Sequence, residues 1–400
     1  MIELLAPAGS LEKAKTAIDY GADAVYIGGK SFSLRSRASN FGPEEIGELT
    51  AYAHAKGAKV HVTVNMIPHE EDLPGLDQWL LLLDELEVDA IIAASPWILK
   101  RAGELGCRFE RHVSTQHSSV NSATVKFWKK QGMDRVVLGR ECTMDQIRMI
   151  CSRTDTAIEA FIHGGMCVSY SGRCVLSNHL TNRDANRGGC AQSCRWKYHV
   201  LQDGKRLSDS DKLFSMSSKD LRGLRQVPAM MEVGVSSLKI EGRMKSAYYL
   251  ATVVSTYRRL IDAVSAGKEI TEEFLQELES ELDKAENRPT GSGFLEGIPD
   301  RHMQLYREHA ELVTQEFTAL VLDDRDAEGW ARIQIRNRLE PNQELEIFGP
   351  GILPSVILFD DVKDMEGNRP EILNRPMQEV MARWQGPCQK GAMIRKTLNR

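Results

Sequence analysis

Short runs of apolar, β-branched residues recur along roughly the first 240 residues, and each run is closed by Gly, Pro, Asn or a charged residue. Most of the intervals between them accommodate one helix and two loops, which is the repeat of a parallel α/β fold. The pattern predicts a (β/α)8 TIM-like barrel, and a doubly wound open sheet is the less favoured alternative. The eight predicted strands are Ile2–Pro7, Ala24–Gly28, Lys59–Asn65, Ala90–Ala94, Glu110–Thr115, Arg135–Gly139, Ala157–Ile162 and Ser237–Glu241.

Capping residues predict where several of the intervening helices begin and end. Ser10 and Asn121 each precede an amphipathic segment, and these segments stop at Gly21 and Gly132. Side-chain oxygens at such N-caps accept a hydrogen bond from the first helical turn, whereas glycine tolerates the positive φ that follows a helix. Thr143 is followed three residues later by a glutamine, which is the spacing of a capping box.

The pattern also divides the chain into parts. The interval between the seventh and eighth strands is long enough to hold an insertion, residues 164–236, within a barrel that spans residues 1–270. Residues 271–310 are expected to form a helical connector. From residue 311 to 400 the period changes to two, which predicts a small C-terminal β-barrel domain. Its six predicted strands are Phe317–Leu322, Trp330–Ile335, Glu344–Phe348, Val356–Phe359, Gln378–Ala382 and Ala392–Lys396.

Parallel barrels place their chemistry on the loops that follow the carboxyl ends of the strands. Four arginines on one face suit a ligand with carboxylates or phosphates, because guanidinium groups bind both in a bidentate manner. Each residue taken singly is equally well explained as a loop hydrogen bond or salt bridge. The candidates at these strand ends are Arg35, Arg37, Asn65, Gln116, Arg140, His163, Glu241 and Arg243.

Four of the eight cysteines lie close together in the predicted insertion, with the spacing C-x6-C-x15-C-x3-C. Four thiolates in one loop are able to bind one zinc ion or one iron-sulfur cluster. Structural zinc sites usually contain close pairs two to four residues apart, so the first gap favours an iron-sulfur cluster. Zinc and free or redox-active thiols are the alternatives. The four residues are Cys167, Cys174, Cys190 and Cys194.

The charge of the chain is unevenly distributed. With 51 basic and 56 acidic residues, the net charge of -5 argues against general binding of polyanions. Residues 167–197, however, contain five bases and one acid, with Trp196 among them. This segment is a candidate RNA-binding patch, although its charge is also explained as compensation for thiolates and its aromatic residues as hairpin packing. The five bases are Arg173, Arg183, Arg187, Arg195 and Lys197.

Several function classes lack local support. The chain opens without a basic, then apolar, signal sequence, and no apolar stretch is long enough to span a membrane, so a cytoplasmic location is expected. Motifs of serine hydrolases, zincins, P-loop NTPases and dinucleotide-binding proteins are missing. Cys142, just beyond the sixth strand, is a possible nucleophile, but the sequence positions no base beside it.

The segment from Glu159 to Cys194, with the four cysteines and His163-Gly-Gly-Met-Cys167, resembles the signature of the peptidase U32 family, also called collagenase-like. Leu5–Gly9, Ala22–Tyr26 and Ser33–Arg35 resemble its opening motifs. Further segments resemble the tRNA-hydroxylating subgroup of this family, and the resemblance extends over essentially the whole chain. These segments are Ala123–Trp128, Cys190–Tyr198, Ser218–Leu221 and Ser237–Arg243.

The resemblance implies hydroxylation of the wobble uridine of certain tRNAs to 5-hydroxyuridine, the precursor of 5-carboxymethoxyuridine and 5-methoxyuridine. It implies that the four cysteines hold a [4Fe-4S] cluster supplied by the iron-sulfur assembly machinery, and that prephenate, a dicarboxylate, provides the hydroxyl group without molecular oxygen. The rim arginines and Tyr170 are then substrate-binding candidates, and His163 and Glu241 are candidates for proton transfer. A U32-type peptidase and a non-catalytic RNA-binding accessory subunit are the alternative functions.

Overall fold

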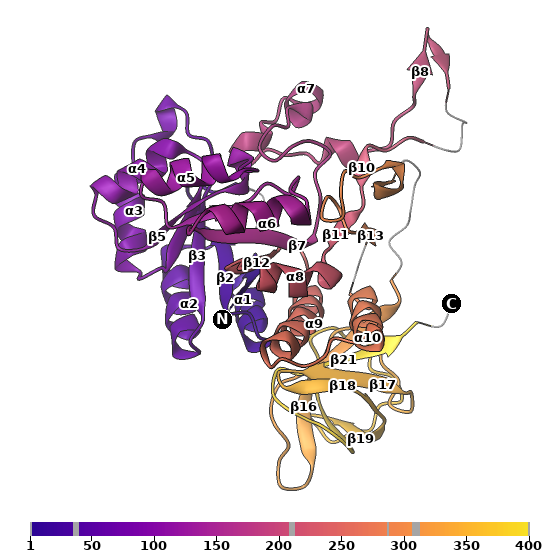
Figure 1. Cartoon of the computed structure of the whole chain (residues 1–400). Coiled ribbons are helices and arrows are strands. Elements are labelled where there is room, and N and C mark those ends of the chain that lie inside the picture. The colour runs from indigo at the N-terminus through magenta and orange to yellow at the C-terminus, as the bar shows by residue number, and fades with distance from the viewer. Residues whose placement is uncertain (1, 35–39, 208–212, 286–287, 306–312, 399–400) are drawn as a thin grey trace.

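The computed structural model describes residues 2–34, 40–207, 213–285, 288–305 and 313–398. Eight parallel strands pair in chain order, and the last of them pairs with both the first and the seventh, so the sheet closes into a barrel (Figure 1). This closure confirms the predicted (β/α)8 barrel over the open sheet. The strands are β1 (Glu3–Pro7), β2 (Ala24–Gly28), β3 (Lys59–Val64), β4 (Ala90–Ala93), β5 (Glu110–Val113), β6 (Arg135–Val137), β7 (Ala157–Gly164) and β12 (Ser237–Ile240).

The barrel helices begin at the predicted caps. The side chains of Ser10 and Asn121 accept hydrogen bonds from the first turns that follow them, and Thr143 and Gln146 form the reciprocal bonds of a capping box. The helices around the barrel are α1 (Leu11–Asp19), α2 (Pro43–Ala55), α3 (Leu76–Glu85), α4 (Pro96–Glu104), α5 (Ser122–Lys130), α6 (Met144–Arg153), α8 (Val227–Glu232) and α9 (Ala247–Ser265). Short 3-10 turns lie at Glu70–Asp72, Thr115–His117 and Leu224–Gln226.

The insertion between β7 and β12 contains α7 (Leu176–Thr181), 3-10 turns at Ala185–Arg187 and Ser193–Arg195, and a projecting hairpin of β8 (Leu201–Gln202) and β9 (Lys205–Arg206) (Figure 1). Its end returns to the barrel, where β11 (Asp220–Arg222) pairs with β7 and with β13 (Thr290–Gly291). In addition, β10 (Ser217–Ser218) pairs with β14 (Gln304–Leu305), which follows a 3-10 turn at Arg301–Met303. The second half of the predicted connector therefore forms one structure with the insertion.

The C-terminal domain is one curled antiparallel sheet of seven strands in the order β18-β17-β21-β15-β16-β20-β19. The sequence predicts six strands because Val356–Phe359 spans the junction between β18 and β19, which only Leu358 separates. The two ends of the sheet are thus successive parts of one segment, and the sheet curls back on itself. The strands are β15 (Gln315–Val321), β16 (Trp330–Ile335), β17 (Leu345–Gly349), β18 (Ile352–Ile357), β19 (Phe359–Asp364), β20 (Glu379–Trp384) and β21 (Met393–Thr397).

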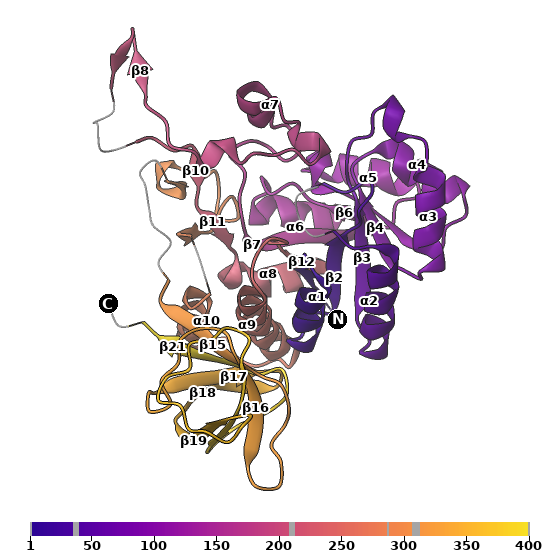
Figure 2. The ribbon, with the colours of Figure 1, turned by 180° about the vertical axis from the view of Figure 1, so that it is seen from behind.

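This sheet packs below α9 and α10 (Glu272–Asp283), at the end of the molecule opposite the hairpin (Figures 1 and 2). Arg395 is fully buried in the interface and donates hydrogen bonds to the carboxylates of Glu281 and Glu346. The Tyr20 hydroxyl donates to the Gly391 carbonyl over 2.9 Å. The C-terminal domain is therefore fixed to the amino ends of the barrel strands, and the opposite face is left to the insertion. No described helix is long and apolar enough to cross a membrane.

Candidate functional site

The barrel interior holds a network of buried charged side chains beside a small apolar cluster that includes Leu5 and Ile92. Glu159 is fully buried and accepts a 2.7 Å hydrogen bond from the Lys239 ammonium and a 3.2 Å bond from Arg135, which also pairs with Glu3. Burial alone would raise the pKa of Glu159, but the charges of Lys239 and Arg135 hold it below its ordinary value. The Glu159 carboxyl is therefore kept ionised, and the network lies beneath the mouth of the barrel.

Above this network lies a mouth cavity of about 160 Å³. It is built from residues at the carboxyl ends of seven of the eight barrel strands, as the parallel topology requires. Five of the candidates from the sequence meet there, namely Asn65, Gln116, Arg140, Glu241 and Arg243. The other lining residues are Tyr26, Leu34, Thr63, Ile92, Ser114, Thr115, Val137, Phe161 and Lys239.

Several neutral oxygen atoms help to position Arg243. Its guanidinium donates to the hydroxyls of Ser33 and Thr63 over 3.3 and 3.4 Å and to the Leu34 carbonyl. Gly28 makes room for it, because a Cβ atom at residue 28 would lie 1.9 Å from the guanidinium. Hydroxyl and carbonyl oxygens orient a cation without cancelling its charge, and the oriented Arg243 lines the cavity, where guanidinium groups suit anionic ligands.

Arg140 connects the cavity to the cysteine-bearing insertion. Its guanidinium donates to the Gly165 carbonyl over 2.6 Å and lies 3.6 Å from the Cys167 sulfur. It also lies over the Phe161 ring, 5.0 Å from the centroid. Glu241 is held from the other side, where its carboxylate accepts the Gly165 N–H over 3.3 Å. A ligand in the cavity would therefore contact the same arginine, Arg140, that contacts the cysteine loop.

Lys239 is a site residue that the sequence analysis missed. Its ammonium lies 4.4 Å from the centroid of the Tyr26 ring and 5.5 Å from that of Phe161, and its side chain is almost completely buried. A lysine within a strand is ordinarily taken as a surface residue. The usable signal was the alternation in Ser237-Leu-Lys-Ile-Glu241, which places Lys239 and Glu241 on the same face of β12.

His163 does not line the cavity. The register between β7 and β12 shifts after the Phe161–Lys239 pair, so that His163 pairs with Ile240, and its ring lies against α9, where it hydrogen-bonds to the Tyr257 hydroxyl over 3.1 Å. Burial, with the charges of Arg222 and Lys245, lowers the pKa of His163 to about 3. The strand irregularity explains why simple alternation, which brings residue 163 to the mouth, misplaces this side chain.

The four insertion cysteines carry free thiols, and Cys167 lies against Arg140 at the mouth. Burial raises the pKa of Cys194, the charge of Arg195 opposes this rise, and the charges of the other three insertion cysteines add to it. The Gln192 N–H donates to the Cys190 sulfur over 3.4 Å. Four thiols in one loop, one of them in contact with Arg140, provide the donor set of a thiolate-bound cluster. In the described part of the chain, no group of three or more His, Cys, Asp or Glu side chains is arranged around a single metal ion.

The insertion lies across the loops of several strands. The Ser118 hydroxyl donates to the Ser171 carbonyl, and the Ser171 N–H donates to Glu141. On the other side, the Ile67 N–H donates to the Asn186 carbonyl over 3.2 Å, and Arg187 pairs with Asp72. The insertion is therefore anchored on both sides of the mouth rather than tethered at its ends alone.

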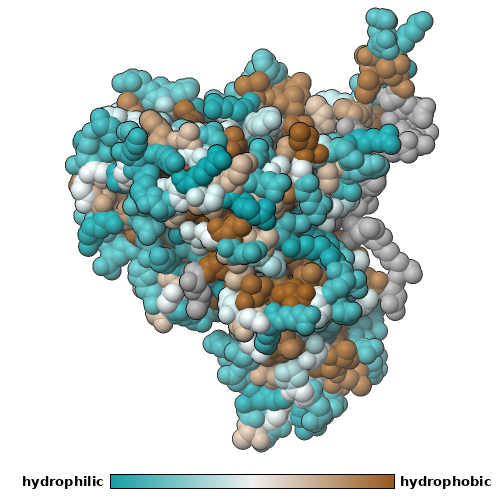
Figure 3. Space-filling view, viewed as in Figure 1, coloured by the Kyte–Doolittle hydropathy of each residue, from teal (hydrophilic) through white to brown (hydrophobic). Residues whose placement is uncertain are grey.

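The remaining candidates occupy different surroundings. Arg173, Arg195, Trp196 and Lys197 are exposed, whereas Arg183 and Arg187 are half-buried. Tyr170 is 62% exposed and does not line the mouth cavity. Arg35 and Arg37 lie outside the described residues. Apolar side chains that include Leu201 and Leu207 are exposed on the projecting hairpin (Figure 3).

The structure gives no support to Cys142 as a nucleophile. Its side chain is 2% exposed, and burial, together with the charge of Glu141, raises the pKa of the thiol to about 12. A thiol in these surroundings is protonated near neutral pH, whereas cysteine nucleophiles require an accessible thiolate. The cysteine closest to the sixth strand is therefore a core residue.

Comparison with known proteins identifies the family that this chain resembles. Residues 9–305 match the family model "Peptidase family U32", and residues 313–395 match "Peptidase family U32 C-terminal domain". The chain is 45% identical over 402 residues to tRNA hydroxylation protein P1 of Bacillus subtilis (strain 168), covering 98% of this chain and 94% of that protein.

Two further relatives are similar over shorter lengths. The tRNA hydroxylation protein P of Escherichia coli (strain K12) is 34% identical over 87% of this chain and 86% of its own length. The 23S rRNA 5-hydroxycytidine C2501 synthase of the same organism is 41% identical over 66% of this chain but only 40% of its own length.

Proposed function

The chain belongs to peptidase family U32, and from this membership we propose that it is an RNA-hydroxylating enzyme whose substrate is tRNA. The observation that carries the proposal is the match, over nearly the full length of both chains, to a protein named for tRNA hydroxylation. A relative named as a 23S rRNA 5-hydroxycytidine synthase supports hydroxylation of a pyrimidine ring. The geometry supports it as well, because Arg140 joins the mouth cavity to the cysteine loop.

The finer proposal is prephenate-dependent 5-hydroxylation of the wobble uridine. A dicarboxylate suits the mouth cavity because Arg140, Arg243 and Lys239 all line it. The new C–O bond replaces the C–H bond at C5, so the uracil ring loses two electrons. The C–O bond of the donor breaks, and its carbon takes up those two electrons and a proton. The reaction is thus balanced between the two substrates.

The wobble uridine is unpaired in the anticodon loop, so its entry into the cavity requires no opening of a duplex. Within the cavity, Glu241 is the carboxylate beside Arg140 and Gly165, and it is our candidate for removing the C5 proton. His163 lies outside the cavity, and its lowered pKa keeps it neutral. We assign it a positioning role between β7 and α9.

We propose that Cys167, Cys174, Cys190 and Cys194 hold a [4Fe-4S] cluster supplied by the iron-sulfur assembly machinery. One-electron transfer is the chemistry that such a cluster supplies when bound. Arg140 contacts the Cys167 sulfur and the Gln192 N–H donates to the Cys190 sulfur, and donors of this kind stabilise thiolates. The exposed bases around these cysteines then offer contacts for the phosphates of the anticodon loop.

The test is mass spectrometry of tRNA nucleosides from a deletion strain complemented with the wild-type or a variant chain. We expect 5-hydroxyuridine-derived nucleosides to return with the wild type and with Cys388→Ala, and to remain absent with Cys167→Ala. Cys388 is a matched control because it lies in the C-terminal domain. Unchanged nucleosides in the deletion strain would contradict the proposal. Purified chain that binds the tRNA but leaves it unmodified with prephenate and a reductant would indicate an accessory subunit.

A further inference from the structure

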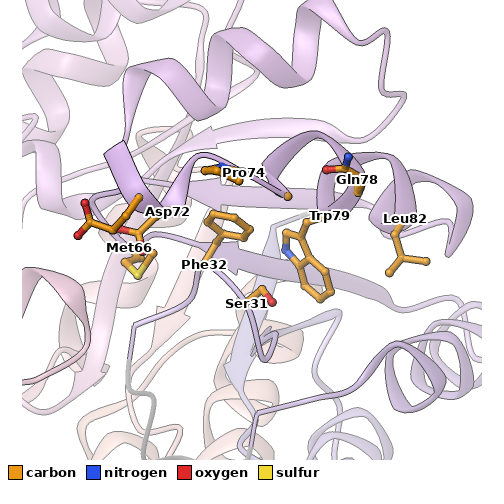
Figure 4. Close-up of a pocket in the computed structure, with 10 residues that line it drawn as sticks. Ser31, Phe32, Met66, Asp72, Pro74, Gln78, Trp79 and Leu82 are labelled. Carbon is orange, nitrogen blue, oxygen red and sulfur yellow. The ribbon is translucent and has the colours of Figure 1, made fainter. Parts of the chain in front are cut away.

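A second cavity, of about 480 Å³, lies on the same face of the barrel, between the loop after β2 and the start of α3. Its walls include Phe32, Met66, Trp79 and Leu82, and its polar lining includes Asp72 and Gln78 (Figure 4). None of these residues is used by the mouth cavity. We call it the aromatic cavity.

The two cavities are immediate neighbours. Phe32 lines the aromatic cavity and Leu34 the mouth cavity, while Met66 lines the aromatic cavity and Asn65 the mouth cavity. The Leu34 N–H donates to the Asn65 side-chain oxygen over 3.1 Å, which ties the two loops together into the ridge between the cavities. Two residues of extended chain span about 7 Å. A group that adjoins a ligand in the mouth therefore has only this ridge to cross to reach the aromatic cavity.

Phe32 and Trp79 are both fixed in place. The indole of Trp79 packs on Gly29, where a Cβ atom would lie 2.3 Å from the ring. Phe32 has a φ of +57°, a conformation unfavourable for a bulky residue, and its carbonyl accepts the Met66 N–H over 3.0 Å. Figure 4 shows the indole nitrogen on the edge that faces Phe32. That N–H is buried and has no hydrogen-bond partner among the described residues.

The end of the cavity at Asp72 is polar. Its carboxylate accepts the His69 N–H over 2.8 Å and pairs with Arg187 of the insertion, as does the neighbouring Glu71. Carboxylate oxygens have further lone pairs and accept hydrogen bonds from amino groups of nucleobases. An aromatic wall with an unpartnered N–H donor and a carboxylate end matches a planar heterocycle that carries both acceptors and an amino group.

We propose that the aromatic cavity binds the nucleobase next to the modified uridine. The inference rests on the proposed function, because an RNA strand whose uridine enters the mouth cavity must place a neighbour at the ridge. Stacking on Phe32 supplies affinity, and the carboxylate end favours a base with an exocyclic amino group over uracil. The pairing of Arg187 with Asp72 places the insertion beside this base.

The experiment measures binding of a fluorescent anticodon stem-loop RNA by anisotropy, with each neighbour of the target uridine replaced in turn by an abasic nucleotide. We expect one abasic RNA to bind wild-type protein about tenfold more weakly. Phe32→Leu should bind the intact RNA about tenfold more weakly than the wild type does. The variant should bind the abasic RNA as tightly as it binds the intact RNA. Phe127→Ala, which removes a 52% exposed aromatic side chain from α5, is the matched control and should behave as the wild type.

Equal losses for the abasic RNA on wild type and Phe32→Leu would overturn the proposal, because the base and Phe32 would then act independently. A titration of the free protein with adenosine monophosphate separates the two sources of a heterocycle. Micromolar binding that Phe32→Leu abolishes, without coupling to the RNA base, would identify a small-molecule site and also overturn the proposal. Failure of the hydroxylation assay with the RNA coupling intact would contradict the proposed function alone.

Discussion

Buried cations at the two ends of the barrel are stabilised in different ways. At the interface with the C-terminal sheet, Arg395 is fully buried between the carboxylates of Glu281 and Glu346. At the mouth, Arg243 is only 6% exposed, and its described hydrogen bonds include two to hydroxyls and one to a carbonyl. A cation paired with buried carboxylates holds the structure together, whereas Arg243 lines the mouth cavity, where it is able to meet a ligand. The comparison predicts opposite consequences of substitution at the two ends.

The largest effect is expected at the interface. Arg395→Met removes the cation and leaves the buried Glu281 and the half-buried Glu346 with Lys284 as a remaining cationic partner, which should lower the free energy of unfolding by about 3 kcal/mol. Urea denaturation monitored by circular dichroism measures this free energy of unfolding. Arg338→Met, which breaks an exposed pair with Glu340, is the control and should change stability by less than about 1 kcal/mol. Equal, small effects would show that the interface does not depend on its buried charges.

At the mouth we expect a small effect of substitution on stability and a large effect on activity. Arg243→Gln should leave stability within about 1 kcal/mol, because Ser33 and Thr63 retain the 2.7 Å hydrogen bond between their hydroxyls. It should lower kcat/KM for the anionic donor about 100-fold, equivalent to about 2.7 kcal/mol. Steady-state kinetics with varied donor concentration measures this loss. A variant that unfolds readily but retains its kcat/KM would place Arg243 with Arg395 as a structural residue.

Mild acid should destabilise the barrel at a higher pH than it destabilises the interface with the C-terminal sheet. Burial lowers the pKa of His61, His112 and His163, so the unfolded chain binds more protons below pH 6.5 and the barrel loses stability as the pH falls. For His163, with a pKa of about 3, the loss at pH 5 is about 2 kcal/mol. At the interface, the charge of Arg395 helps to hold the pKa of Glu346 below its ordinary value against burial, so its contribution is lost only below about pH 4.5.

Urea denaturation between pH 7 and 5 tests this separation. The wild-type chain should lose stability over this range, and His163→Gln should show a shallower dependence because glutamine does not titrate. Equal slopes for the two proteins would show that His163 takes up its proton equally in the folded and unfolded chains.

The barrel and the insertion also differ in how much of their structure the sequence reveals. All eight barrel strands follow from apolar runs, and the rim residues that end them, such as Arg140 and Arg243, are brought together because parallel strands share one edge. The strands of two or three residues that join the insertion to residues 290–305 are too short to carry a period. Lys239 resembles a surface residue until Glu159 is known to lie beside it. The shifted register at His163 depends on tertiary pairing.

The smallest effect concerns the residue that joins the cavity to the cysteine loop. The guanidinium of Arg140 reaches the Gly165 carbonyl with one nitrogen and the Cys167 sulfur with the other. Lysine keeps the charge but has a single nitrogen, so it satisfies one of these partners at a time. Arg140→Lys should therefore lower kcat about tenfold, equivalent to about 1.4 kcal/mol, and should leave the unfolding free energy nearly unchanged.

The informative measurement for Arg140→Lys is a comparison of kcat with the iron and sulfide content of anaerobically purified protein. We expect the iron and sulfide content to equal that of the wild type, because the four cysteines are intact, while kcat falls. Arg148→Lys, at an exposed pair with Asp145 on α6, is the matched control and should retain full kcat. Loss of iron in proportion to kcat would instead make Arg140 a residue that stabilises the cysteine loop, and the mouth would then resemble the interface in using its arginine for structure.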